Sequence, residues 1–301
     1  MNRAGEGVAV GEPLVKSMPG PSKGLSASLI AAAVLLVLVA IVYRGILVDL
    51  VGDWWRDPNF SHGFFVPAFS LFVLWQRREQ LAKIEPRPSW FGSLVVAGSL
   101  AVMIVGVLGS EFFLPRFSLV MLLGGLVINF YGWRAFRAVL FPWAVLFLMI
   151  PIPAIIFNQV TFPLQLMASR LATGLLQLLG VPVLREGNII QLPVMSLEVA
   201  EACSGIRSLV SLTTLAVIYG FFIEERTSRR VLLLIFAVPI AVIANALRVM
   251  GTGLAAQYWD PSKAEGFFHE FSGWIIFIVS LSLLLLVHRA MRLFDREAKA
   301  S

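Results

Sequence analysis

The chain has 301 residues, of which 58% are hydrophobic and 14% are charged, and its formal net charge is +6. Soluble domains carry about 25% charged residues and need less apolar surface, so the composition excludes an ordinary soluble protein. The positive charge does not indicate nucleic-acid binding, because the basic residues lie in short clusters between apolar runs, as membrane topology signals do. Apolar segments in a bilayer must satisfy their own backbone hydrogen bonds, which predicts an all-α polytopic membrane protein.

The predicted elements begin after a polar tail. Residues 1–24 are rich in Gly, Pro and Ser and predict a disordered cytoplasmic tail. About eight transmembrane helices are predicted from the apolar runs at 25–48, 61–76, 90–110, 113–131, 136–157, 204–222, 231–252 and 272–288. We expect residues 25–290 to form a single transmembrane domain and residues 291–301 to form a second cytoplasmic tail.

Two segments between the fifth and the sixth apolar run have a different character. Segment 158–180 has polar residues among leucines that recur every three or four positions. This amphipathic pattern predicts a helix that lies at the membrane interface rather than one that spans the bilayer. Residues 181–200 contain two short extended runs around a Glu-Gly-Asn turn at 186–188 and predict a small extramembrane β-hairpin.

The positions of the basic residues predict the orientation of the chain. With the N-terminal tail inside and eight spans, most of the 24 Lys and Arg residues lie on the cytoplasmic side. Both termini are therefore expected inside. If segment 158–180 also crossed the membrane, the basic cluster at 224–230 would lie outside, and the charge count argues against that.

This orientation brings three reactive residue types to the outer face. Cys203, the only cysteine, begins the sixth run, Arg248 lies near the outer end of the seventh, and His269 precedes the eighth. A thiolate forms most easily at a helix N-terminus, and a histidine exchanges protons near neutral pH. An arginine stabilises an oxyanion or holds a carboxylate. The pattern predicts catalysis by a cysteine nucleophile, with His269 as acid and base and Arg248 as the oxyanion or carboxylate ligand.

Each of these residues also has a structural interpretation. A lone helical cysteine is usually a small buried hydrophobe, and an arginine near a helix end usually extends to the lipid headgroups. The surrounding polar residues favour a functional interpretation, because polar groups in apolar spans are costly. The supporting candidates are Glu201, Ser204, Gly205, Arg207, Asn245, Ser272 and His62.

Four of these candidates carry specific expectations. The backbone N–H groups of Ser204 and Gly205 are expected to act as oxyanion donors, since the first turn of a helix has unpaired donors. Arg207 either lowers the thiol pKa or binds substrate, or else pairs structurally with Glu201 or Glu198. His62 either lines the site or is a structural residue at the interface.

Metal and cofactor chemistry are not expected. One cysteine cannot form an internal disulfide or a cysteine-rich metal site, and the chain has only three histidines. We therefore predict no metal and no cofactor.

Four short motifs resemble those of a known family. The segments 201–206 (Glu-Ala-Cys-Ser-Gly-Ile), 245–248 (Asn-Ala-Leu-Arg) and 269–274 (His-Glu-Phe-Ser-Gly-Trp) resemble the three signatures of the exosortase/archaeosortase family. Segment 61–64 (Ser-His-Gly-Phe) resembles its N-terminal region, and the resemblance runs from about residue 50 to residue 290.

The resemblance implies a membrane cysteine protease or transpeptidase whose catalytic domain is the segment 25–290. Cys203 would be the nucleophile, Arg248 the oxyanion or substrate-positioning group, and His269 the acid and base. The implied substrates are exported proteins with a C-terminal sorting signal, made of a Pro-Glu-Pro-type motif, a transmembrane helix and a basic cluster. The signal would be cleaved through a thioester.

The resemblance also implies a location and partners. The family's link to exopolysaccharide-producing Gram-negative bacteria implies the bacterial inner membrane, with the active site facing the periplasm. Expected partners are the sorting-signal helix and membrane lipids, with no nucleic acid. Two other functions stay open, a non-catalytic membrane component of exopolysaccharide export and a membrane acyl or lipid transferase. The protein substrate, the acceptor nucleophile and the oligomeric state stay open, as does whether the reaction is hydrolysis or transfer.

Overall fold

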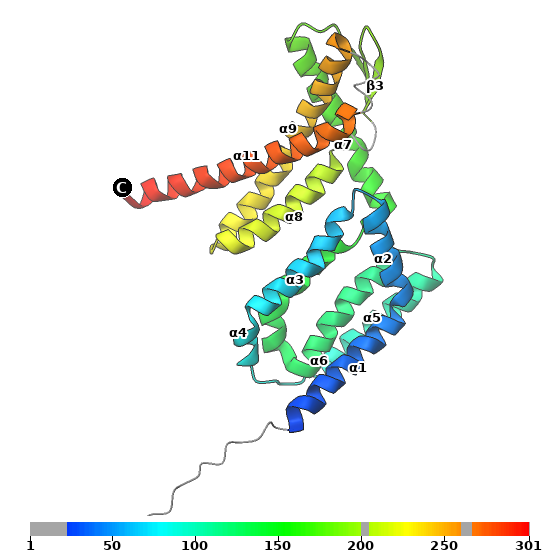
Figure 1. Cartoon of the computed structure of the whole chain (residues 1–301), viewed down its shortest axis with the longest axis vertical. Helices are drawn as coiled ribbons and strands as arrows, with labels where there is room; N and C mark the ends of the chain where they lie inside the picture. Colours follow the sequence, from blue (N-terminus) through cyan, green and yellow to red (C-terminus); the bar gives the residue numbers. More distant parts are fainter. Residues whose placement is uncertain (1–22, 200–204, 260–266, 301) are drawn as a thin grey trace, which may run out of the picture. The chain divides into compact units, whose positions relative to one another are not determined.

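The computed structural model describes residues 23–199, 205–259 and 267–300 (Figure 1). The chain divides into two compact units, Met1–Leu47 and Val48–Ser301, and all candidate site residues belong to the second unit. The elements are α1 (Lys23–Val42), α2 (Arg44–Arg56), η1 (Ser61–Phe64), α3 (Phe65–Gln76), α4 (Arg78–Ala82), α5 (Phe91–Leu108), α6 (Phe113–Val145), η2 (Leu146–Met149), α7 (Ala154–Leu178), β1 (Leu184–Glu186), β2 (Ile189–Gln191), β3 (Ser196–Glu198), α8 (Ile206–Ile223), α9 (Thr227–Tyr258) and α11 (Phe267–Ala300).

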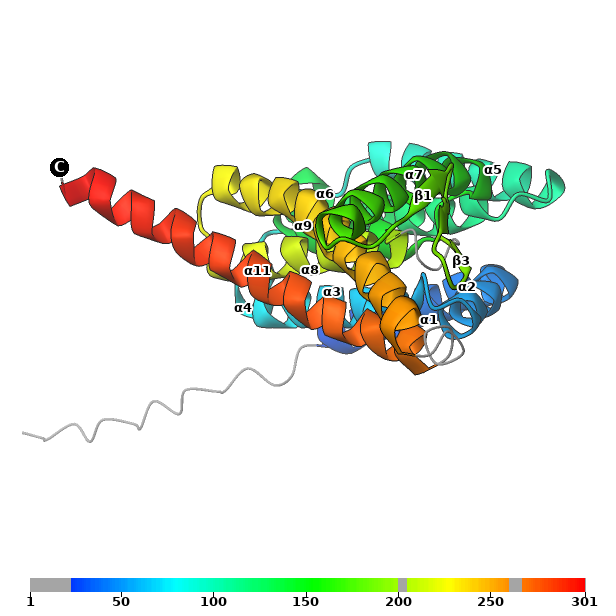
Figure 2. The same ribbon diagram turned by 90° about the horizontal axis from the view of Figure 1, so that it is seen from above.

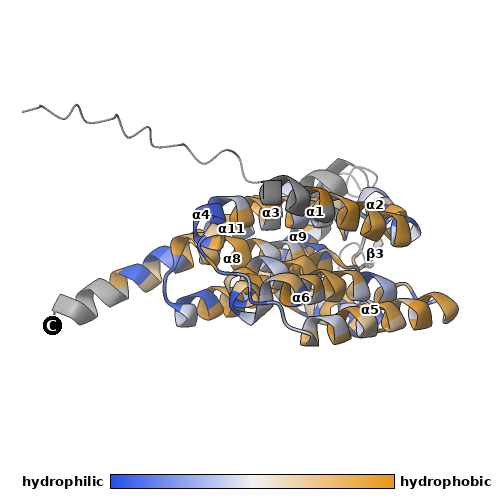
Figure 3. Ribbon diagram, turned by 90° about the horizontal axis from the view of Figure 1, so that it is seen from below, coloured by the Kyte–Doolittle hydropathy of each residue, from blue (hydrophilic) through white to orange (hydrophobic). Residues whose placement is uncertain are grey.

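The chain is a multi-pass helical membrane protein. Five of its described helices are long and apolar enough to cross a bilayer: α5, α6 together with η2, α8, α9, and the part of α11 from Gly273 to Leu293. A sixth is added if Ala32–Val42 and Arg44–Arg56 count as one bent span. In Figure 3, hydrophobic residues cover α5, α6 and α8, whereas hydrophilic residues gather at α4.

The prediction of about eight transmembrane helices is therefore not confirmed. The apolar run at 61–76 begins as a short 3₁₀ turn, so that its α-helix, α3, has only 12 residues. The two runs at 113–131 and 136–157 lie on either side of a break at Gly132. Trp143 Nε1 donates a 2.8 Å hydrogen bond to Val120 O, 23 residues away, so the two halves of α6 lie against each other.

Gly132 divides α6 into two helical halves. Its φ of 80° and ψ of −178° are not helical. A Cβ atom at this position would lie 2.0 Å from the carbonyl oxygen of Arg87, so only glycine fits. The extended segment beside the break supplies hydrogen bonds, from Arg87 N to Tyr131 O (3.2 Å) and from Ser89 N to Asn129 O (3.3 Å). These bonds satisfy carbonyl groups that the break removes from the helical pattern.

The region between α6 and α8 has the predicted helix and a slightly larger sheet. Helix α7 is not among the spanning candidates. Strands β1 and β2 form the predicted hairpin, with Arg185 opposite Ile190, and β3 adds a third antiparallel strand to it. The turn of the hairpin includes Gly187, whose φ is 64°.

Helix α7 buries a face that is rich in small residues. Ala168, Ala172 and Leu176 are buried in a cluster with Ile190 of the sheet and Val249 of α9. The larger side chains of α7 stay mostly exposed, for example Met167, Leu171 and Leu178. Small residues let α7 lie close to α9, and the exposed leucines suit an apolar surrounding. The cluster fixes the part of α9 that carries Arg248.

Helices α8, α9 and α11 form a three-helix layer that positions the candidate site. Helices α8 and α9 lie side by side, joined by the short segment 224–226, and α11 crosses them (Figures 1 and 2). Leu212 of α8, Leu233 and Ala237 of α9, and Leu284 of α11 are fully buried in their common core. Lipid tails are as apolar as leucine, so this core holds the three helices together by close van der Waals packing.

Candidate functional site

The polar motif before α8 meets the polar motif of α9 through a glycine. Gly205 is buried, with a left-handed backbone (φ 83°), and Leu209 N donates a hydrogen bond to its carbonyl oxygen (2.8 Å). A Cβ atom at Gly205 would lie 2.8 Å from Cγ of Asn245, whose side chain is only 1% exposed. The chain therefore needs glycine here so that the start of α8 can lie directly against Asn245.

The motif of α9 also meets the motif of α11 at a glycine. Arg248 is half-buried, and Thr252 Oγ1 donates to its carbonyl oxygen (3.0 Å). A Cβ atom at Gly273 would lie 3.9 Å from Nη2 of Arg248, so the guanidinium group is next to α11. Position 269 lies four residues before Gly273 in the same helix.

The contacts at Gly205 and Gly273 join three motifs that lie far apart in the sequence. Gly205 is two positions after Cys203, and Asn245 is one turn before Arg248. Cys203, Glu201 and Ser204 lie outside the described residues, and the side chains of His269 and Ser272 are not described either. Residues of three motifs, 201–206, 245–248 and 269–274, come together around Asn245 and Arg248.

Arg207 connects the first turn of α8 to another motif. Its Nε donates a 3.3 Å hydrogen bond to Oδ1 of Asn59, which lies three residues before His62. Asn59 is itself positioned by Asp57, whose Oδ1 accepts a 2.8 Å hydrogen bond from Asn59 N. Sequence reasoning missed Asn59, because no pattern along the chain relates it to Arg207.

His62 has a structural contact. Its Nε2 lies 3.0 Å from the carbonyl oxygen of Leu148, and Trp54 Nε1 donates to the next carbonyl, that of Met149 (2.8 Å). The last carbonyls of a helix have no intrahelical donor, so these two side chains close the end of η2. Gly63 is required beside them, because a Cβ atom there would lie 2.3 Å from Trp54 Nε1. His62 thus has a structural contact, and its role as a residue that lines the site stays a prediction.

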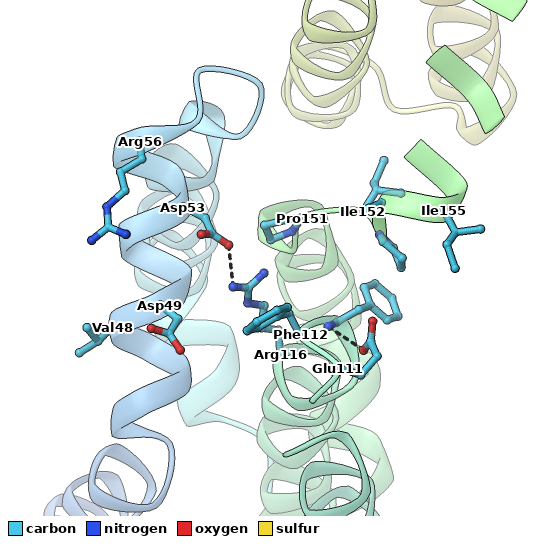
Figure 4. A pocket seen from close by; sticks show the side chains of 14 residues that line it. Val48, Asp49, Asp53, Arg56, Glu111, Phe112, Arg116, Pro151, Ile152 and Ile155 are labelled. Atoms are coloured by element: carbon cyan, nitrogen blue, oxygen red, sulfur yellow. Dashed lines mark hydrogen bonds and ion pairs between the residues drawn. The ribbon is translucent and has the colours of Figure 1, made fainter. Parts of the chain in front are cut away.

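A separate hollow of about 530 Å³ lies between α2, the start of α6 and residues 151–155 (Figure 4). Asp53 and Arg116 point toward one another inside it and form a 2.6 Å ion pair, with Arg116 only 5% exposed. Glu111 accepts hydrogen bonds from the backbone N–H groups of Phe113 and Leu114 (2.8 Å each) and so caps α6. None of its lining residues belongs to the motifs of α8, α9 or α11.

The sequence analysis also missed a buried polar network at the other ends of α8, α9 and α11. Glu224 and His288 are 4% and 5% exposed, and Nε2 of His288 lies 2.6 Å from Oε1 of Glu224. Tyr219 O–H lies 2.7 Å from Nδ1 of His288, and Arg229 donates to Oε2 of Glu224 (3.1 Å). Burial raises the pKa of the Glu224 carboxyl, but hydrogen bonds from His288 and Arg229 outweigh it and hold the pKa below its ordinary value.

The described residues offer no metal site. Within these ranges, no group of three or more His, Cys, Asp or Glu side chains is arranged to hold an ion. Among the described residues, Arg248 supplies a cation, Asn245 a buried amide, and the N-terminal end of α8 a dipole that favours negative charge.

The fold and the polar cluster define a multi-pass membrane protein with candidate chemistry at one end of its helices. The family model described as transmembrane exosortase (Exosortase_EpsH) matches the chain over residues 54–286. The chain belongs to this family, which confirms the resemblance seen in the motifs and supports a membrane transpeptidase role in general terms. Comparisons with curated proteins and with solved structures found no match.

Proposed function

We propose that this protein is a membrane cysteine protease or transpeptidase that cleaves the C-terminal sorting signals of exported proteins. The signal would consist of a Pro-Glu-Pro-type motif, a transmembrane helix and a basic cluster. The observation that carries the proposal is the meeting of Gly205, Asn245, Arg248 and Gly273, because these residues belong to the three motifs that supply the nucleophile, the cation and the histidine. Family membership supports the same class of reaction.

In the proposed mechanism, the Cys203 thiolate attacks the scissile carbonyl carbon and forms a C–S bond. Negative charge develops on the carbonyl oxygen, and the Arg248 guanidinium stabilises it. His269 donates a proton to the leaving amine as the C–N bond breaks, which leaves a thioester. A second nucleophile, either water or an acceptor amine or lipid, then attacks the thioester and releases the product, and the thiol is restored.

The proposed location is the bacterial inner membrane, with the site facing the periplasm. The substrate helix would enter laterally from the bilayer, so that its motif reaches the outer face. Its basic cluster would stay in the cytoplasm, in keeping with the charge bias of membrane segments.

The test is a co-expression assay with a reporter that carries the three-part signal. We expect Cys203→Ala to abolish processing while the protein still inserts in the membrane. Arg248→Ala should also abolish it, and partial activity of Arg248→Lys would assign a charge role rather than bidentate geometry. Arg170→Ala, an exposed arginine of α7, is the matched control and should retain activity. Full processing by Cys203→Ala would refute the proposal.

The two other functions make different predictions. A non-catalytic component of polysaccharide export requires no reactive thiol, so Cys203 would be dispensable and slow to react with a maleimide. An acyl or lipid transferase would use the same nucleophile, but the group attached to Cys203 would be a lipid and not a peptide. Mass spectrometry of the acylated protein separates these functions.

A further inference from the structure

Two neighbouring hollows lie at the ends of α8, α9 and α11 that are remote from Gly205 and Arg248. They measure about 700 Å³ and 350 Å³, and both are lined by Ile223 and Arg292. The 18 residues of α8 separate this end of the helices from the Gly205 end. At 1.5 Å per residue the separation is about 27 Å, close to the thickness of the bilayer core. These hollows are therefore distinct from the candidate active site.

The buried polar groups beneath the hollows form hydrogen bonds with one another. With its proton on Nε2, His288 donates to Oε1 of Glu224 (2.6 Å), and its Nδ1 accepts the Tyr219 hydroxyl (2.7 Å). The second carboxylate oxygen of Glu224 accepts from Arg229, and its carbonyl accepts from Arg230 Nε (2.7 Å). Because both carboxylate oxygens of Glu224 are engaged, its negative charge is compensated locally and does not neutralise other cations.

The rim of the hollows has an excess of positive charge. Arg226, Arg289 and Arg292 are exposed lining residues, and Glu225 is the one exposed acidic residue among the linings. None of these three arginines forms a side-chain ion pair within the part of the chain that the structure describes. Arginine binds phosphate through two parallel hydrogen bonds, so such a rim suits a phosphate group.

The wall of the larger hollow is apolar. Leu285 and Leu286 of α11 line it, together with Leu293 and Ile223, and all four are exposed. A free phosphate ion would gain nothing from these leucines. A lipid with a phosphate headgroup would use both the cationic rim and the apolar wall, and basic pockets between transmembrane helices bind anionic lipid headgroups.

We propose that the hollows between α8 and α11 bind one anionic phospholipid. Its phosphate group lies between Arg289, Arg292 and Arg226, and its acyl chain lies along Leu285 and Leu286. This site is independent of the proposed catalytic residues.

The test is native mass spectrometry of the full chain in detergent, titrated with phosphatidylglycerol or phosphatidylcholine. The variant Arg289→Gln/Arg292→Gln is expected to bind phosphatidylglycerol about tenfold more weakly. The matched control is Arg134→Gln/Arg137→Gln, which removes two exposed arginines that are also three residues apart on one helix, α6. The control is expected to bind as the unmodified protein does.

Three outcomes would overturn the proposal. One is an equal loss of binding in the control, which would indicate general attraction by the basic face. Another is equal affinity for phosphatidylcholine. The third is displacement of the lipid by inorganic phosphate at equal concentration, which would indicate a site for the free ion. If the double variant does not fold, Arg226→Gln provides the same test, because this exposed residue precedes α9.

Discussion

At the scale of single residues, the glycines of the motifs are places where two segments of the chain lie next to each other. Gly205 lies against Asn245, Gly63 against Trp54 and Gly273 beside Arg248. At Gly205 the backbone is also left-handed. These contacts explain why the motifs contain glycine next to their polar residues: a side chain at Gly205 would push the start of α8 away from Asn245, and one at Gly63 would overlap Trp54.

Gly205→Ala tests this explanation. A non-glycine residue in the left-handed region costs roughly 1–2 kcal/mol, and the added methyl group also overlaps Asn245. We expect a lower unfolding temperature in detergent and loss of reporter processing. Gly251→Ala in α9 is the control, since nothing lies within 4 Å of its added Cβ, and it should be neutral or stabilising. Unchanged stability and processing in Gly205→Ala would contradict the explanation.

The buried carboxyl of Glu224 predicts a specific acid sensitivity. Its pKa is lowered in the folded state, because hydrogen bonds from His288 and Arg229 outweigh the opposing effect of burial. The ionised form therefore stabilises the fold above the unfolded carboxyl pKa of about 4.3, and this contribution is lost as pH falls through the folded-state pKa. The unfolding temperature should fall between pH 5 and pH 3, and by less in Glu224→Gln.

The control for this prediction is Glu79→Gln, which changes an exposed carboxylate whose side chain is 83% accessible. This variant should show the same fall as the unmodified protein. An equal fall in Glu224→Gln and in Glu79→Gln would show that Glu224 does not carry the effect.

Some residues of the polar clusters could be predicted from the sequence, and others could not. Asn245 and Arg248 were predicted as a functional pair because polar residues one turn apart in an apolar span are costly, and the structure places both beside the other motifs. The contact between Glu224 and His288 was missed. These residues are 64 positions apart, and neither stands in a pattern that reveals which distant side chain it meets.

At the scale of elements, the break at Gly132 shapes α6. A helix of this length curves gently, and it changes direction sharply only where a residue interrupts its hydrogen bonds. Gly132 does so with a positive φ, and the carbonyl oxygen of Arg87 fills the space where a side chain would be.

Gly132→Ala is therefore expected to lower the unfolding temperature strongly, because its Cβ atom would lie 2.0 Å from a backbone oxygen. Backbone atoms cannot move aside as a side chain does, so the cost should exceed the roughly 1–2 kcal/mol of the left-handed conformation alone. Gly98→Ala in α5 is the control, since its added Cβ meets no atom within 4 Å. Similar unfolding temperatures for the two variants would contradict this account of the break.

The sequence predicted which segments are helices and strands better than it predicted where each one begins and ends. Apolar runs correctly indicated helices, and the Glu-Gly-Asn turn correctly indicated the hairpin. The number of spans was not confirmed, since hydropathy does not show that 61–76 starts as a 3₁₀ turn. The runs at 113–131 and 136–157 do meet at a break, which is Gly132. The spacing of large leucines in α7 did not reveal its buried face, because close packing on α9 selects Ala168 and Ala172.

At the scale of the whole molecule, α8, α9 and α11 separate two polar regions at their opposite ends. One lies around Asn245 and Arg248, and the other is the network of Glu224 and His288. We propose that the first faces the periplasm and the second the cytoplasm, as the charge bias predicts.

Single-cysteine labelling tests this orientation. In a Cys203→Ser background, Glu186→Cys in β1 should react with an impermeant maleimide in intact cells. Glu79→Cys in α4 should react only after the membrane is opened. Both positions are exposed, so access depends on the side of the membrane. Reaction of Glu79→Cys in intact cells would reverse the orientation.

The central claim is that the three motifs form one site with Cys203 as its nucleophile. The most direct measurement is intact-protein mass spectrometry of the enzyme mixed with a peptide that carries the sorting signal. The account predicts a peptide adduct on Cys203 that hydroxylamine removes, as expected of a thioester, and none in Cys203→Ala. An adduct on another residue, or product formation by Cys203→Ala, would contradict it.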